Sequence, residues 1–118
     1  MAIDMRTESP QLLVLRFHGM VPASEVAESQ SAAAKMMERG KLSMLVLLDG
    51  FEGWGKGDTD QWGDVSFLAG HDKDVTKMAI VGEERWREPV LMFAAVGFRR
   101  SPVRYFGDES TARAWLAE

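Results

Sequence analysis

The hydrophobic pattern of the chain centres on a short apolar run, residues 44–48 (Met-Leu-Val-Leu-Leu), which Asp49 and Gly50 follow directly. An apolar run this short, bounded by turn residues, is typical of a strand that is buried on both faces. Such strands occur in parallel sheets that helices cover on both sides. In open α/β sheets, ligands bind beyond the carboxyl ends of the strands. The pattern therefore predicts an α/β fold and a functional region at Asp49 and the loop expected after it.

The remaining pattern predicts four more strands and about four helices. Short apolar or alternating segments between turn residues predict strands at residues 3–7, 12–18, 75–81 and 103–106. Helical spacing and capping residues predict helices at about residues 22–39, 58–69 and 89–96, and from residue 108 onward. Strands that alternate with helices indicate a parallel sheet with right-handed crossovers, and the first two strands form a hairpin that adds one antiparallel edge strand. We expect a single domain of residues 1–118.

Composition narrows the class of protein. The chain has 118 residues and no cysteine, which excludes disulfide and thiol chemistry and fits a reducing, cytoplasmic compartment. A formal net charge of −4 argues against a general affinity for nucleic acid. No stretch approaches the roughly 20 apolar residues that span a bilayer, and no signal-peptide pattern is present. The expected protein is therefore cytoplasmic and not transmembrane.

A set of stretches in fixed order along the chain is similar to a known family. The stretches are the strand ending in Asp49, Trp54 and Trp62 around a glycine-rich segment, residues 77–82 with Trp86 after them, and residues 103–106 followed by Ala112, Ala114, Trp115 and Leu116. Together they resemble the SpoIIAA-like family, small bacterial domains with the STAS (sulfate transporter and anti-sigma antagonist) type of fold. The resemblance covers nearly the whole chain.

The resemblance implies a fold and a class of function. It implies a STAS-like sheet of four or five strands, mostly parallel with one antiparallel edge strand, packed by about four helices. It also implies no established enzymatic activity, protein partners for related domains, and likeness to lipid-binding CRAL-TRIO domains. Anti-sigma antagonists carry a phosphorylated serine after the aspartate that ends this strand, whereas Gly50 follows Asp49 here. We therefore predict that the phosphorylation switch of that branch is missing.

Aromatic residues cluster in the segments that should meet at the carboxyl ends of neighbouring strands. Parallel strands bring these segments to one edge of the sheet, and ligand pockets are mostly apolar with a few placed polar groups. We predict an apolar pocket with Asp49 at its mouth, gated by residues 50–57 and the helix after them. Its other members are Phe51, Trp54, Trp62, Phe67, Trp86 and Phe93. Part of this cluster, Trp86 above all, can instead be ordinary core, and Asp49 can instead be a loop cap.

Three other motifs resemble ligand sites, but each fits an ordinary structural role better. Residues 50–57 approach a phosphate-binding loop, but Gly57 stands where a serine or threonine must hold Mg²⁺. Residues 71–74 (His-Asp-Lys-Asp) fit a solvated turn better than a metal site. Arg99, Arg100 and Arg104 form a basic patch that suits an acidic partner, a lipid headgroup or simple surface.

Two classes of function remain. The first is a non-catalytic binding domain that takes a small apolar or lipid-like molecule at the carboxyl ends of the strands. The alternative is a STAS-type protein-interaction or regulatory module that lacks the phosphorylatable serine and acts on a protein partner or as a homodimer. We expect no enzymatic activity and no cofactor. Peripheral contact with a membrane is compatible with the first class of function. A closed apolar cavity under the second and third helices would favour the small ligand, and a flat apolar surface would favour the protein partner.

Overall fold

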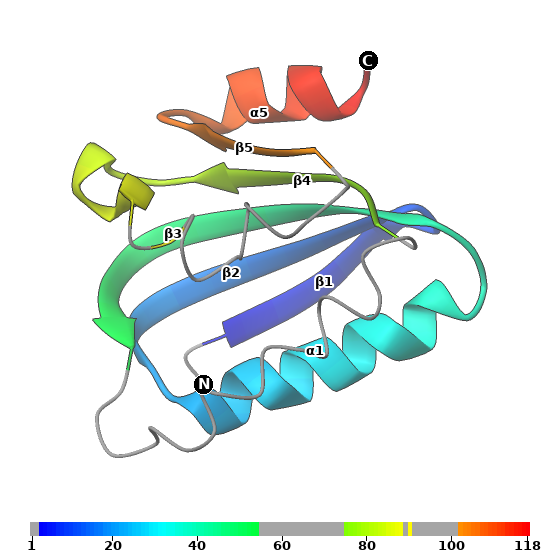
Figure 1. The fold of residues 1–118 in the computed structure, drawn as a ribbon, viewed down its shortest axis with the longest axis horizontal. Coiled ribbons are helices and arrows are strands. Elements are labelled where there is room, and N and C mark those ends of the chain that lie inside the picture. The colour runs from blue at the N-terminus through cyan, green and yellow to red at the C-terminus, as the bar shows by residue number, and fades with distance from the viewer. Residues whose placement is uncertain (1–2, 55–74, 89, 91–101) are drawn as a thin grey trace.

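In the part of the chain that the structure describes, five strands form one mixed sheet with a helix on each face (Figure 1). The computed structural model describes residues 3–54, 75–88, 90 and 102–118. Strand order across the sheet is β1-β2-β3-β4-β5; β1 runs antiparallel to β2, and the other neighbours are parallel. This confirms the predicted α/β class and its antiparallel edge strand. The elements are β1 (Ile3–Ser9), β2 (Leu12–Val21), α1 (Ala23–Met37), β3 (Leu42–Trp54), β4 (Val75–Val81), the 3-10 turn η2 (Glu84–Trp86), β5 (Val103–Phe106) and α5 (Glu109–Leu116).

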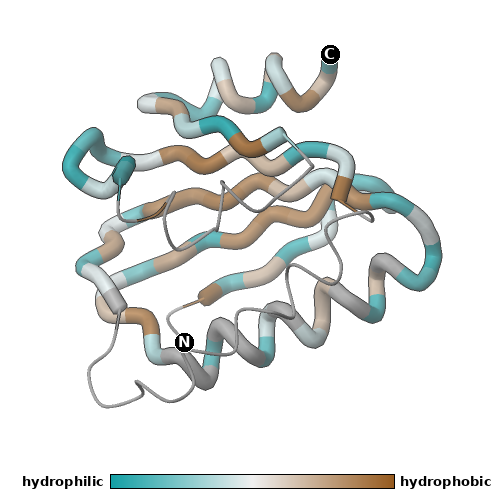
Figure 2. The backbone as a smooth tube through the Cα atoms, in the orientation of Figure 1, coloured by the Kyte–Doolittle hydropathy of each residue, from teal (hydrophilic) through white to brown (hydrophobic). Residues whose placement is uncertain are grey.

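The central strand β3 is buried on both faces, as its apolar run predicts, because alternate side chains enter two separate cores. Figure 2 shows hydrophobic residues along the middle strands. The α1-side core comprises Ile3, Leu13, Leu15, Val21, Ala33, Leu42, Met44, Val46, Phe51, Val75, Met78, Ile80 and Val90. The α5-side core comprises Val14, Leu45, Leu47, Ala79, Ala112 and Trp115.

The last helix begins directly after Asp108, the residue that the sequence predicts as its cap. The Asp108 side chain accepts a hydrogen bond from the Thr111 backbone amide at 3.0 Å, which satisfies a first-turn donor of α5. At the other end, the Lys77 ammonium of β4 donates to the carbonyl oxygens of Trp115 (2.9 Å) and Glu118 (3.2 Å). Both ends of α5 are therefore fixed, and its C-terminal end is tied to the sheet.

The predicted count of about four helices is matched only in part. Within the described residues, α1 and α5 are the two complete α-helices. The helix expected at residues 58–69 lies outside the described residues, as does most of the helix expected at 89–96. Residues 87, 88 and 90, which are described, have helical backbone.

The expectation that β3 ends at Asp49 is wrong. Pairing with β2 continues from Leu48, opposite Phe17, to Trp54, opposite Val21. The register shifts twice in this stretch, so β3 uses two more residues than β2 between these pairs. Asp49 therefore lies inside a bulged strand rather than at the start of a loop.

Each shift in register coincides with a glycine of positive φ. Gly50 has φ +73° and Gly53 has φ +121°, conformations that L side chains rarely adopt. Glycines that suggest a loop from sequence alone thus serve here as bulge residues, and they extend the sheet by six residues beyond Leu48.

Candidate functional site

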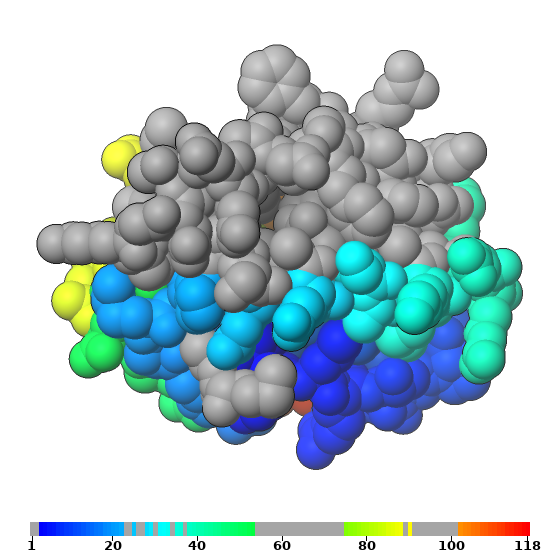
Figure 3. Space-filling model, turned by 90° about the horizontal axis from the view of Figure 1, so that it is seen from below, coloured from blue at the N-terminus to red at the C-terminus, as the bar shows by residue number. Residues whose placement is uncertain are grey.

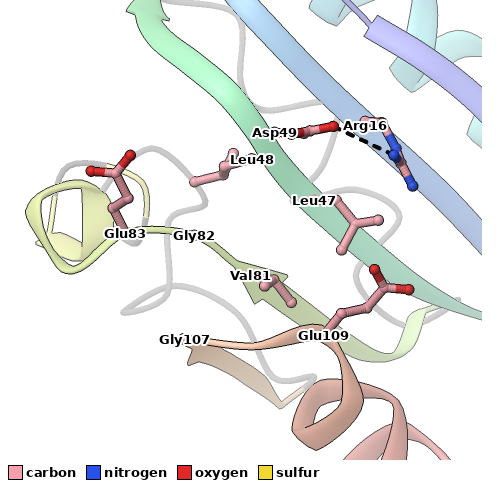
Figure 4. A pocket seen from close by; sticks show the side chains of 9 residues that line it. All are labelled: Arg16, Leu47, Leu48, Asp49, Val81, Gly82, Glu83, Gly107 and Glu109. Carbon is pink, nitrogen blue, oxygen red and sulfur yellow. Dashed lines mark hydrogen bonds and ion pairs between the residues drawn. The ribbon is translucent and has the colours of Figure 1, made fainter.

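An open groove lies beside residues 47–49 in the middle of β3 and the carboxyl ends of β4 and β5, next to the start of α5 (Figure 4). Its volume is about 390 Å³. Apolar side chains of the two strands form part of its wall, and charged side chains from four different elements or their flanks surround them. The lining residues are Arg16, Leu47, Leu48, Asp49, Val81, Gly82, Glu83, Gly107 and Glu109. A site at this edge of the sheet agrees with the general position of ligand sites in open α/β sheets.

Asp49 enters this groove from the first bulge of β3. Its carboxylate lies 3.4 Å from the guanidinium of Arg16 on β2, on the face of the sheet that α5 covers. The side chains of Arg16 and Asp49 are 41% and 62% exposed. An ion pair this exposed contributes about 0–1 kcal/mol, so a binding partner can replace either member at little cost.

Gly82, which lines the groove, is tightly packed on the opposite, α1-side face of the sheet. A Cβ atom at Gly82 would lie 2.6 Å from the Tyr105 hydroxyl oxygen and 2.7 Å from Cδ1 of Leu48. The Tyr105 hydroxyl donates a hydrogen bond of 2.6 Å to the carbonyl oxygen of Glu83. Burial, helped by the nearby charges of Glu84 and Glu83, raises the pKa of Tyr105 to about 12. Tyr105 is therefore a neutral donor that fixes the chain after β4.

A network of ion pairs holds the α5 side of the groove. The Glu109 carboxylate accepts a hydrogen bond from Nε of Arg113 at 2.7 Å. The two terminal nitrogens of Arg113 donate to Glu8 at 2.7 and 2.9 Å, so this pair is bidentate. Hydrogen bonds from Arg113 and then Arg6 lower the pKa of Glu8 from 4.5 to about 2. The i,i+4 spacing of Glu109 and Arg113 was a readable signal, but nothing in the sequence indicates the pair with Glu8, 105 positions away.

Two of the aromatic residues predicted as ligand-binding meet on the opposite face of the sheet. The ring centroids of Phe51 and Trp86 lie 4.9 Å apart with planes at 63°, and Phe17 lies 6.1 Å from Phe51. Phe51 is buried and belongs to the α1-side core, against which Trp86 packs half-buried. The sheet thus separates this pair from the carboxylate of Asp49.

The other predicted members cannot be placed in the same way. Trp54 ends β3, and its backbone is paired with Val21. Trp62, Phe67 and Phe93 lie outside the described residues, so the aromatic pocket as a whole stays a prediction.

The remaining motifs give no second site in the part of the chain that is described. There, no group of three or more His, Asp or Glu side chains is placed to hold a metal ion. Of the basic patch, Arg104 lies over the rings of Phe106 (5.5 Å) and Trp115 (5.6 Å), while Arg99 and Arg100 lie outside the described residues. None of the described helices is long and apolar enough to cross a membrane.

Residues that the sequence did not single out contribute most of the groove. Arg16, Gly82, Glu83 and Glu109 looked like strand, turn or surface positions because they come from three separate places in the chain: β2, the segment after β4, and α5. Of the predicted site residues whose side chains the structure describes, Asp49 lines the groove, whereas Phe51 and Trp86 do not.

Comparisons with known proteins agree with this architecture. One similar solved structure is an uncharacterised protein with a SpoIIAA-like fold from Shewanella loihica, with a TM-score of 0.69 and 18% identity over 98% of this chain and 92% of that one. Another is the anti-sigma factor antagonist SpoIIAA in its unphosphorylated form, with a TM-score of 0.60 and 11% identity over 98% and 96% of the two chains. A third is the Bacillus cell fate determinant SpoIIAA in its phosphorylated form, with a TM-score of 0.59 and 12% identity over 98% and 99%.

These likenesses, at 18% identity or less, establish the fold alone. Among curated proteins, the comparison gave no significant match. The sequence profile of the SpoIIAA-like family matches residues 12–117, which is nearly the whole chain. The resemblance noted from the sequence is thereby confirmed, and this chain belongs to the SpoIIAA-like family.

Proposed function

We propose that the protein is a non-catalytic regulatory module that binds a protein partner at the carboxyl edge of its sheet. The observation that carries the proposal is the groove of about 390 Å³ beside Asp49. It is open and bordered by exposed charges, which suits a protruding segment of another protein better than an enclosed small molecule. Membership of the SpoIIAA-like family, whose namesake structures include an anti-sigma factor antagonist, supports the same class of function.

Regulation in this proposal differs from that of a phosphorylated antagonist. Gly50 follows Asp49 in the first bulge of β3 and carries no hydroxyl group. Partner binding is therefore controlled by the amount of partner or by another signal, and not by phosphorylation at this position.

Charge reversal in the groove tests the proposal. Proteins from the native cell extract would be captured on the wild-type chain, and each protein enriched there would be purified and titrated by calorimetry. We expect Asp49→Arg and Glu83→Arg each to weaken binding by about tenfold or more, which corresponds to about 1.4 kcal/mol. Both side chains are exposed, at 62% and 72%, so the fold should tolerate the changes.

A matched variant separates the groove from general charge effects. Glu38→Arg makes the same change of charge at an exposed position after α1 and should bind like the wild type. The proposal fails if no captured protein binds saturably, or if the groove variants and Glu38→Arg have the same affinity.

A small apolar or lipid-like ligand is the second candidate, and one observation favours it. Met20 is 47% exposed, and its sulfur lies 4.0 Å from where a Cβ atom at Gly53 would stand. Trp86, at the end of η2, approaches the same point at 3.5 Å. Exposed methionine beside a half-buried indole suits an adaptable apolar contact.

The two candidates respond to different experiments. Native mass spectrometry before and after organic extraction would reveal a co-purified lipid. Titration of a fatty acid, followed by tryptophan fluorescence, should give a saturable change that Met20→Glu weakens and Asp49→Arg leaves intact. A response that is absent, or that Trp54→Ala and Trp62→Ala both leave unaltered, would exclude the predicted aromatic pocket.

A further inference from the structure

The edge strand β1 presents backbone groups that β2 does not use. The Ile3 amide donates to the Glu25 carboxylate of α1 at 2.9 Å, so it faces away from β2. In an antiparallel pair, hydrogen-bonded and non-hydrogen-bonded residues alternate. Because the register with β2 is regular from Ile3 to Thr7, the amides and carbonyls of Met5 and Thr7 also face outward. Figure 3 shows β1, in dark blue, at the molecular surface beside α1.

Within residues 3–7, where β1 is regular, its charges are complementary to a second copy of β1 in one register. Asp4 and Arg6 flank Met5 on the same face of the strand, with side chains 67% and 69% exposed. If two β1 strands pair antiparallel about Met5, each Asp4 lies opposite the Arg6 of the other copy. Sliding one strand by two residues in one direction places Asp4 opposite Asp4, and sliding it by two in the other direction places Arg6 opposite Arg6. Both arrangements are repulsive.

The outward backbone groups agree with this register. Pairing about Met5 makes the two Met5 residues a hydrogen-bonded pair, which uses the groups that face outward. Asp4 and Arg6 then form non-hydrogen-bonded pairs, in which opposing side chains lie closest. Asp4 also contacts His18 at 2.8 Å and Arg6 contacts Glu8. A carboxylate accepts several hydrogen bonds and a guanidinium donates five, so these contacts can persist in the pair.

A cavity beside the edge supplies a second, independent observation. A space of about 180 Å³ lies between β1 and α1, lined by Ile3, Met5, Glu25, Glu28 and Ser29. In the register about Met5, the second copy places its own Met5 beside this space, on the α1 side of the sheet. Methionine is flexible enough to fill an irregular apolar gap.

We propose that the chain forms a symmetric dimer in which the two β1 strands pair antiparallel about Met5 and join the two five-stranded sheets into one. The interface is isologous, since the same strand contributes on both sides. The register shift between Thr7 and Ser9 ends the regular pairing and limits the contact to residues 3–7. This inference does not depend on the proposed function, because β1 lies at the far edge of the sheet from β4 and β5.

Charge exchange tests both the interface and its register. The mass in solution would be measured by sedimentation equilibrium over a wide range of concentrations for the wild type, Asp4→Arg and Arg6→Asp. The wild type should dimerise, and each single variant should be monomeric where the wild type is dimeric. An equimolar mixture of the two variants should restore the dimer, because the arginine introduced at position 4 of one chain then faces the aspartate introduced at position 6 of the other. Arg39→Asp, at an exposed position outside β1, should dimerise like the wild type.

Each outcome decides the question. Circular dichroism would first establish that both single variants are folded, and Met5→Pro, which removes an outward amide, gives a further variant that should lose the dimer. A wild type that stays monomeric, or single variants that dimerise as well as the wild type, overturn the proposal. Monomeric variants whose mixture also remains monomeric overturn the register.

Discussion

Replacing Gly82 by alanine probes the tight packing behind the groove, where Leu48 and Tyr105 lie on the α1 side of the sheet. The added Cβ atom would lie 2.6 Å from the Tyr105 hydroxyl oxygen, 2.7 Å from Cδ1 of Leu48 and 3.0 Å from its Cβ. The leucine methyl can move by a change of rotamer. Tyr105 belongs to β5 and its hydroxyl is held by the Glu83 carbonyl, so this ring has to shift as a unit.

The loss of stability expected for Gly82→Ala has two sources, overpacking and a lost hydrogen bond. Overpacking a well-packed site costs about 1–3 kcal/mol. Displacing the Tyr105 hydroxyl from Glu83 adds about 0.5–1.5 kcal/mol, the net worth of a typical hydrogen bond. We therefore expect Gly82→Ala to lower the free energy of unfolding by about 1.5–4.5 kcal/mol.

A double-mutant cycle in urea tests this reasoning. Tyr105→Phe removes the oxygen that meets the new methyl, so Gly82→Ala should cost at least about 1 kcal/mol less in the Tyr105→Phe background. Tyr105→Phe alone measures how much free energy of unfolding is lost with the hydrogen bond when there is no crowding. Strictly additive effects of the two substitutions would refute the assignment of the strain to Tyr105, and a cost below about 0.5 kcal/mol would refute the crowding itself.

Three further predictions address the core, the ion-pair network and the first bulge. Leu47→Ala should cost about 2–5 kcal/mol in urea unfolding, because Leu47 is buried in the α5-side core; a loss below about 1 kcal/mol would contradict this. Glu8 stabilises the fold fully above its ordinary pKa of 4.5 and loses this contribution as the pH falls to about 2, so the stability difference between wild type and Glu8→Gln should shrink over that window. Gly50→Ser, at φ +73°, should cost about 1–2 kcal/mol.

The fold could be predicted from the sequence because its signals are local. The apolar run of β3, the cap at Asp108 and the alternation of strands and helices each depend on neighbouring residues. Long-range contacts left no such signal. The bidentate pair between Glu8 and Arg113 joins residues 105 positions apart, and the groove gathers side chains from several separate elements.

The bulge at Gly50 explains why the predicted site divides into two parts. Aspartate followed by glycine is equally compatible with a turn and with a bulge, and the choice depends on pairing with β2, which the sequence does not reveal. In a regular strand Asp49 and Phe51 would lie on the same face, because side chains repeat every two residues. One extra residue in β3 reverses the alternation, so Phe51 enters the α1-side core while Asp49 stays on the α5 side. Asp49 therefore lines the open groove, whereas Phe51 and Trp86 pack against each other on the other face of the sheet.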